Sequence, residues 1–299
     1  MNLEKLNAQC AIEELQFVKG PGGLVMAEIE NDFAKARIST YSGQVLSFQP
    51  HGEEELLFVS ELAYYQPGKA IKGGMPICWP WFGPDPEGKG RPGHGLVRAA
   101  QWEVLLTQQM DNGATRLRLG ITENDETLAV WPHNFALALE VTVGRQLDVS
   151  LITINTGESE LILTQALHTY FRVGDIGRVA VEGLDGCTYI DKMDDAKEKH
   201  QQGAVTISEQ TDRIYIDVSG DLVINDPSLS RRIRIRSEGS NSAVVWNPWV
   251  EQSAAMGDFG DEEYKQMICV ETTNAGPDQI TVPANGEYRL SLSYSLERD

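Results

Sequence analysis

A period of two in the apolar residues constrains this chain more than any other feature. Apolar residues alternate with small or polar ones through 135–143, 117–121 and 290–296. Such alternation turns one face of a strand toward a core and the other toward water, as in antiparallel sheets. Turn-forming pairs such as Asn112-Gly113 and Asn285-Gly286 separate the runs. The pattern predicts an all-β chain.

Few segments favour helix. Residues 2–16 and 196–202 are the candidates for short helices, and no alternation of strands with helices recurs, which argues against a parallel doubly wound sheet. No linker rich in Gly, Pro or Ser divides the 299 residues. We therefore expect a large antiparallel β-sandwich that forms a single domain over residues 1–299.

The composition argues against two classes of binding partner, nucleic acids and anionic membranes. The chain has 25 basic and 44 acidic residues, a formal net charge of −19, whereas nucleic acids and anionic membranes require basic surface. It has no signal-peptide h-region and no apolar run long enough to span a bilayer. Its four cysteines are widely separated, without zinc spacing. We expect reduced thiols, no nucleic-acid or membrane partner, a cytoplasmic location, and a monomer or weak oligomer.

Two residues have the chemistry of an acid/base pair. If 163–171 is a strand, His168 shares a face with Ala166 and Tyr170, and a histidine exchanges protons near neutral pH. Glu271 ends an apolar run and shares a face with Cys269 in the same way. A carboxylate there is either exposed at an edge or paired in the interior. A structural core histidine and a solvated strand-end glutamate remain the alternatives.

Basic residues gather in the irregular segment 66–98. In an extended conformation His94 and Arg98 share a face, with their backbones roughly 13 Å apart. Lys72, Arg91 and Arg98 would form an island of positive potential suited to a phosphate, or else three solvated cations that never meet. Asp212, near the start of a predicted strand, is equally compatible with a turn or cap.

Aromatic residues mark two irregular segments, 66–98 and 246–263, and loops of this kind on a β scaffold often form binding surfaces. Plugging the ends of the sandwich is the alternative role. The sequence contains no GxSxG elbow, P-loop, GxGxxG fingerprint or HExxH motif. The corresponding hydrolase, nucleotide-binding and zinc-protease functions are therefore disfavoured.

Six segments in order resemble the aldose 1-epimerase superfamily, and in particular its D-hexose-6-phosphate mutarotase (glucose-6-phosphate 1-epimerase) branch. The resemblance runs from about residue 25 to the C-terminus. The segments are KGGMPICWPWFG at 72–83, HGLVR at 94–98, ALHTYF at 166–171, TDRIY at 211–215, WNP at 246–248 and CVE at 269–271.

This resemblance implies a β-supersandwich that binds a pyranose without metal or organic cofactor. It assigns the general acid/base histidine to His168 and the general base to Glu271. It assigns sugar contacts to His94 and Asp212. The phosphate contacts of a small-molecule sugar phosphate fall on Lys72 and Arg98.

The expected reaction interconverts α and β anomers of a hexose 6-phosphate. Glu271 would take the C1 hydroxyl proton while His168 protonates the ring oxygen, and the roles reverse on closure; each such group contributes roughly 10²–10⁴-fold. Two alternatives stay open at this stage. One is an epimerase for unphosphorylated aldoses, and the other is a non-catalytic carbohydrate-binding or regulatory protein on the same fold.

Overall fold

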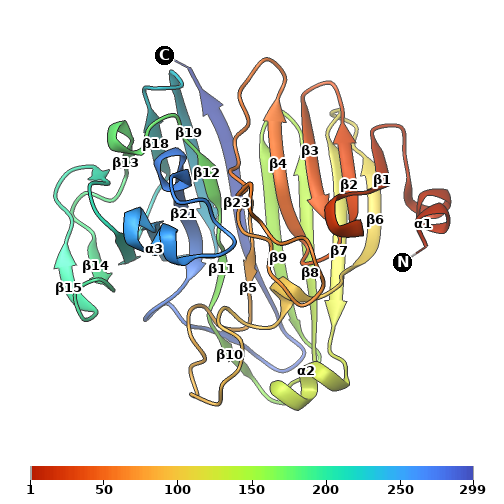
Figure 1. The fold of residues 1–299 in the computed structure, drawn as a ribbon. Helices are drawn as coiled ribbons and strands as arrows, with labels where there is room; N and C mark the ends of the chain where they lie inside the picture. The colour runs from red at the N-terminus through yellow and green to blue at the C-terminus, as the bar shows by residue number, and fades with distance from the viewer. Residues whose placement is uncertain (1, 299) are drawn as a thin grey trace.

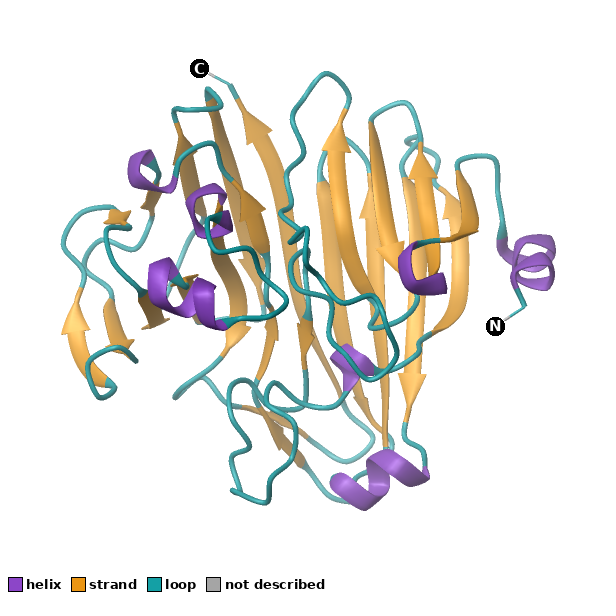
Figure 2. Cartoon of the chain, viewed as in Figure 1, coloured by secondary structure: helices purple, strands orange, loops and turns teal. Residues whose placement is uncertain are grey.

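The computed structural model describes residues 2–298, whose predominant elements are antiparallel strands packed in layers (Figure 1). Helices are short and lie at the periphery of the strands (Figure 2). They are α1 (Leu3–Cys10), α2 (Asp125–Val130) and α3 (Trp249–Ala255), with 3₁₀ turns η1 (Pro21–Gly23), η2 (Val97–Ala99), η3 (Ile176–Arg178) and η4 (Glu263–Gln266). The predicted all-β sandwich is confirmed. Each helix within 2–298 is too short or too polar to cross a bilayer.

The largest sheet has nine strands. In spatial order they are β16 (Val205–Thr206), β13 (Ala180–Glu182), β18 (Leu222–Asp226), β19 (Arg231–Glu238), β23 (Glu287–Glu297), β9 (Leu147–Asn155), β8 (Phe135–Val143), β7 (Thr115–Thr122) and β6 (Glu103–Gln109). The three sequence alternations lie in β7, β8 and β23, as predicted. Along β8, the five alternating apolar side chains from Phe135 to Val143 are buried.

A second sheet of eight strands carries the candidate site. Its order is β15 (Lys197–His200), β14 (Thr188–Asp191), β17 (Thr211–Ile216), β20 (Ser242–Asn247), β21 (Met267–Asn274), β11 (Gln165–Leu167) and β5 (Ile77–Cys78), with β12 (Tyr170–Arg172) also paired to β21. Two smaller sheets are β1 (Leu15–Lys19), β2 (Val25–Glu30), β3 (Ala34–Ser39) and β4 (Gln44–Pro50), and β10 (Leu161–Leu163) with β22 (Ile280–Val282).

One hydrophobic cluster joins all four sheets. Phe48 enters it from the four-stranded sheet, Leu139 from the nine-stranded sheet, Val270 from the eight-stranded sheet and Leu161 from the two-stranded one. Burial of this much apolar surface is the main force that stabilises such layers.

The helix prediction for 196–202 is wrong. Residues 197–200 form β15, an edge strand paired with β14. The chain reverses through Asp195 and Ala196, both in the left-handed conformation, and Lys199 forms ion pairs with Asp191 and Asp194. Charged side chains are common on edge strands because they discourage pairing with other chains. The helix expected within 2–16 is confined to α1, and β1 begins at Leu15.

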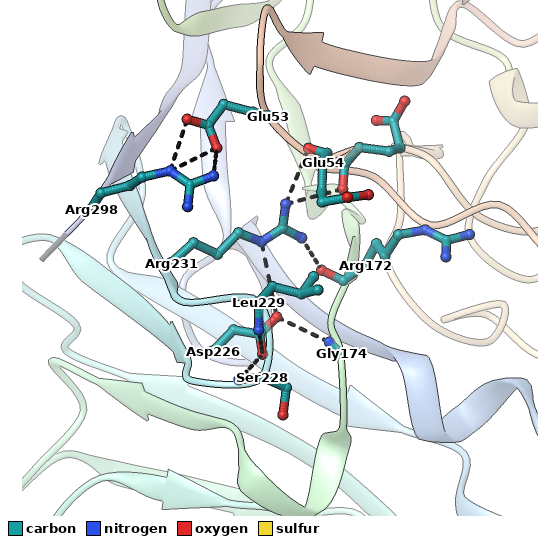
Figure 3. A network of polar contacts seen from close by, with 10 residues as sticks. Glu53, Glu54, Arg172, Gly174, Asp226, Ser228, Leu229, Arg231 and Arg298 are labelled. Atoms are coloured by element: carbon teal, nitrogen blue, oxygen red, sulfur yellow. Dashed lines mark hydrogen bonds and ion pairs between the residues drawn. The ribbon is translucent and has the colours of Figure 1, made fainter.

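A buried arginine joins the layers away from the candidate site (Figure 3). The guanidinium of Arg231 donates to the carbonyl oxygens of Glu54, Glu55 and Arg172, and its Nε lies 3.9 Å from Oδ2 of Asp226. The Asp226 carboxylate also accepts the backbone N–H of Gly174. These contacts tie the β18–β19 turn to the segment after β4 and to β12.

Candidate active site

The carboxyl group of Glu271 lies on the face of β21 that points away from the main core. Ile268 and Val270 belong to the main hydrophobic cluster, whereas Cys269 belongs to a separate cluster. Because side chains alternate along a strand, Glu271 shares the face of Cys269, as the sequence predicted. Its position inside the sheet, between β20 and β11, means that the carboxyl group is buried rather than exposed at an edge.

His168 lies directly across from Glu271. Leu167 is opposite Thr272 and Tyr170 is opposite Cys269, so the same register sets His168 against Glu271. The predicted single strand through 163–171 is instead interrupted at His168: its N–H donates to the carbonyl of Pro76, and the N–H of Thr169 donates to that of Leu167. The predicted shared face with Tyr170 is nevertheless confirmed, because the two rings stack 5.0 Å apart.

The two side chains form a close, buried contact. Nδ1 of His168 is 3.3 Å from Oε1 of Glu271, and the side chains are 12% and 1% exposed. The two groups are in contact without a hydrogen bond, since within residues 2–298 neither carboxyl oxygen nor Nδ1 has a hydrogen-bond partner. Most buried polar groups have a hydrogen-bond partner, and a catalytic role is one of the reasons for which a group lacks one.

Burial moves both groups toward their neutral forms. It lowers the pKa of His168 well below 6.5, and the positive charges of Arg98 and Lys72 lower it further. It raises the pKa of Glu271 well above 4.5, with the negative charge of Asp212 adding to the rise and Lys192 opposing it. Shifted pKa values of this kind cluster at catalytic sites.

Aromatic rings surround the His168 imidazole. The ring of Trp246 lies 6.2 Å away, that of His94 5.7 Å and that of Phe82 6.4 Å. Trp246 is opposite Cys269 on one side and Asp212 on the other, so all three share the site face of the sheet. The sequence had placed Phe82 and Trp246 in aromatic-rich segments and in two of the segments that resemble the family, without assigning either ring a role in the site.

The extended conformation expected for 94–98 is wrong, although His94 does reach the site. His94 and Gly95 both have positive φ, and η2 begins at Val97. A Cβ on Gly95 would lie 1.9 Å from the carbonyl oxygen of Trp79, so only glycine permits this approach. The turn brings Nδ1 of His94 to 3.3 Å from Sγ of Cys78. Burial lowers the pKa of His94 to about 3, so the imidazole is neutral.

A cavity of about 450 Å³ opens beside His168. Lys72 and Arg98 both line it, so the predicted meeting of these cations is confirmed. Lys69 and Asp258 line it as well, and sequence reasoning missed both. Lys69 lies three residues before Lys72, and Asp258 lies in the acidic loop after α3. Neither position in the sequence indicates that these two loops face each other in the fold.

Arg91 does not join this group. Its guanidinium contacts the carboxylates of Asp85 and Glu87 and lies 4.4 Å from the centre of the Trp81 ring. It is absent from the residues that line the cavity, so the three-cation cluster considered from sequence reduces to Lys72 and Arg98, joined by Lys69.

Asp212 stands beside the pair rather than in the wall of the cavity. Its Oδ2 lies 3.5 Å from Nζ of Lys192, a contact that the sequence did not indicate. Burial raises the pKa of Asp212, and the charge of Lys192 opposes that rise. The charge of Lys192 also opposes the rise in the pKa of Glu271, so Lys192 acts electrostatically on the acid/base pair.

One group of side chains within residues 2–298 has the spacing of a metal site. Ligand atoms of His168, Cys269 and Glu271 lie within 4.8 Å of one another. Metal ions bind thiolates and carboxylates, but burial raises the pKa of Cys269 and of Glu271 well above their usual values. This donor set therefore fits proton exchange better than metal binding.

A larger hollow of about 640 Å³ lies over β1 to β4, far from this chemistry. Both cations that line it are paired with carboxylates, Lys35 with Glu30 and Arg37 with Glu28. The smaller cavity is the better candidate, because it adjoins the buried pair and has cations on its wall.

Comparisons with known proteins point to one family. The aldose 1-epimerase family pattern matches residues 26–295. A protein of Escherichia coli (strain K12) named "Putative glucose-6-phosphate 1-epimerase" is 39% identical over 252 residues, 84% of this chain and 83% of that protein. A Cenchrus ciliaris protein of the same name is 35% identical over 298 residues, covering 94% and 87%.

Solved structures agree with this match. A Salmonella typhimurium protein described as a "putative mutarotase" has a TM-score of 0.88 at 32% identity, over 100% of both chains. A "galactose mutarotase related enzyme" from Lactobacillus acidophilus has a TM-score of 0.72 at 14% identity, covering 91% of this chain and 97% of that one. The second is a likeness of fold alone.

Proposed function

This chain belongs to the aldose 1-epimerase family, and from that premise we propose that it interconverts the α and β anomers of a hexose 6-phosphate of the glucose 6-phosphate type. The names of its relatives support the substrate class. The observation that carries the proposal is the buried contact of His168 with Glu271 beside a cavity walled by Lys72 and Arg98.

Ring opening requires one acid and one base. Glu271 as carboxylate takes the proton of the C1 hydroxyl, and His168 as imidazolium donates a proton to the ring oxygen. The C1–O5 bond breaks, its electron pair goes to the ring oxygen, and the C1 oxygen becomes an aldehyde. Rotation about C1–C2 presents the other carbonyl face, and both proton transfers reverse on closure.

The pair has to hold one proton between its two members. Burial lowers the pKa of His168 and raises the pKa of Glu271, which favours a neutral imidazole and a protonated carboxyl. A phosphate at Lys72 and Arg98 offsets two of the charges that lower the pKa of His168. Substrate binding thus favours transfer of the proton from Glu271 to His168, which is the state that the reaction needs.

The remaining polar groups hold the sugar. His94, as a neutral imidazole, and Asp212, oriented by Lys192, are suited to bind ring hydroxyls. Lys72 and Arg98 are suited to the phosphate oxygens.

The test is the rate of anomer exchange of α-glucose 6-phosphate, followed by NMR for the wild type, His168→Asn and Glu271→Gln. We expect the wild type to exceed buffer and both variants to lose roughly 10²–10⁴-fold. Wild-type exchange no faster than buffer would falsify the enzymatic function. Equal rates in all three proteins would remove the residue roles, and faster exchange of glucose than of its phosphate would identify an unphosphorylated aldose as substrate.

A further inference from the structure

Asp258 is the one acidic residue in the wall of the cavity beside His168, where it faces three cations. Its Oδ1 lies 3.6 Å from Nζ of Lys72, and the two side chains are 23% and 22% exposed. Partial burial of both charges makes their attraction stronger than that of an exposed pair. A carboxylate thus lies next to a lysine that lines an anion-sized space.

The contact between Lys72 and Asp258 is loose. A separation of 3.6 Å is too long for a hydrogen bond, so the ammonium gains charge attraction without a donated proton. The other partner of Nζ is the thioether sulfur of Met256 at 3.5 Å, a weak acceptor. Both partners come from the loop after α3, and neither satisfies the ammonium as well as phosphate oxygens would.

The loop that carries Asp258 is fastened to the opposite wall. The hydroxyl of Tyr64 donates to the carbonyl of Gly257 at 2.9 Å, and the N–H of Glu61 donates to Oε1 of Glu263 at 2.8 Å. These bonds flank Asp258 in the chain and fix where its carboxylate stands.

We propose that Asp258 is a specificity-determining residue: its carboxylate pairs with the ammonium of Lys72 until a substrate binds, and a dianionic phosphate displaces it from that ammonium. This inference rests on the proposed function, from which the phosphate end of the ligand comes. A neutral sugar leaves the Lys72–Asp258 pair intact and gains no contact with Lys72. A phosphate dianion brings more charge than the carboxylate it replaces, and it gains Arg98 at the same time.

The same arrangement discriminates among anions. A ligand with a single carboxylate in place of the phosphate only matches the charge of Asp258, while its own charge is repelled by that residue. The site is therefore selective for dianions over monoanions as well as over neutral sugars.

The test measures binding by calorimetry, with inorganic phosphate and with glucose as probes, so that it does not depend on turnover. Asp258→Asn removes the competing charge and should bind phosphate about fivefold more tightly at pH 7.5, with glucose affinity unchanged. Asp261→Asn is the matched control: it removes the same charge from an exposed position in the same loop, outside the cavity wall, and should change neither affinity.

A double variant distinguishes displacement at Lys72 from a general effect of charge. In the Lys72→Met background, Asp258→Asn should no longer tighten phosphate binding, because the pair is already absent. Unchanged or weaker phosphate binding by Asp258→Asn would overturn the proposal, as would an equal gain in Asp261→Asn or in the Lys72→Met background. Failure of the anomerase function would appear instead as absent exchange in the wild type, whatever the phosphate affinities are.

Discussion

Nδ1 of His168 lies 3.3 Å from Oε1 of Glu271. The two residues are opposite each other, His168 between β11 and β12 and Glu271 on β21, and both side chains are almost fully buried. Isolated charges are costly in such surroundings, and burial accordingly lowers the pKa of His168 and raises the pKa of Glu271. Activity and stability therefore make opposite demands on these positions.

The substitution Glu271→Gln should affect activity and stability in opposite directions. The anomerase rate should fall roughly 10²–10⁴-fold because the amide neither takes nor gives the proton. The free energy of unfolding should not fall, and at pH 8 it should exceed that of the wild type. The raised pKa of Glu271 in the folded state means that the unfolded chain releases this proton first as pH rises above 4.5. Urea unfolding at pH 5 and 8 checks this, and a loss of stability at pH 8 would contradict it.

Arg98 and Arg91 form a matched pair of substitutions. Arg98→Gln should raise KM for glucose 6-phosphate about tenfold or more, because a charged phosphate contact is lost from the cavity wall. Arg91→Gln should leave KM unchanged, since its guanidinium contacts Asp85 and Glu87 instead. Steady-state kinetics with glucose as second substrate measures both, and an equal effect on glucose would refute a phosphate role for Arg98.

His94 should make the fold sensitive to mild acid. Burial lowers its folded-state pKa to about 3, so below pH 6.5 the unfolded chain binds this proton before the folded one, and stability falls as pH drops from 6.5 toward 3. Between pH 7 and 5 the loss is about 2 kcal/mol. His94→Asn, which tolerates the left-handed backbone, should flatten this dependence in urea unfolding. His200→Asn, at an exposed site, should not.

Arg231→Met should destabilise the protein by about 3–5 kcal/mol, because it leaves Asp226 and three carbonyl oxygens without their buried cation (Figure 3). Combining it with Asp226→Asn should restore part of the loss, since the stranded charge is removed. Chemical denaturation measures both. A cost below about 1 kcal/mol for the single variant would mean that water replaces the guanidinium.

The strands were predictable because apolar residues alternate with others at the positions whose side chains are buried, as β8 illustrates. The predictions that were wrong concern segments whose conformation depends on tertiary contacts, which the spacing of residues in the sequence does not indicate. Residues 197–200 have helix-forming side chains, yet pairing with β14 and ion pairs to Asp191 and Asp194 make them a strand. The turn at His94 depends on the approach of Gly95 to Trp79. That residues 1–299 form a single domain stays a prediction.

The face of Glu271 followed from the alternation along its strand, whereas its role beside His168 came from the family resemblance. Lys192 and Asp258 were missed because only the folded chain brings the β14–β15 turn and the loop after α3 beside the site. Local sequence around either residue resembles any solvated turn.

Glu271 lies on β21 and His168 in the break between β11 and β12, whereas Lys72 and Asp258 lie on loops and Arg98 in η2. Residues 64–72 and 256–258 are therefore the positions at which a protein engineer would alter the choice of substituent while leaving the strand of the general base intact. Because Lys72 also lowers the pKa of His168, such changes alter reactivity together with ligand choice.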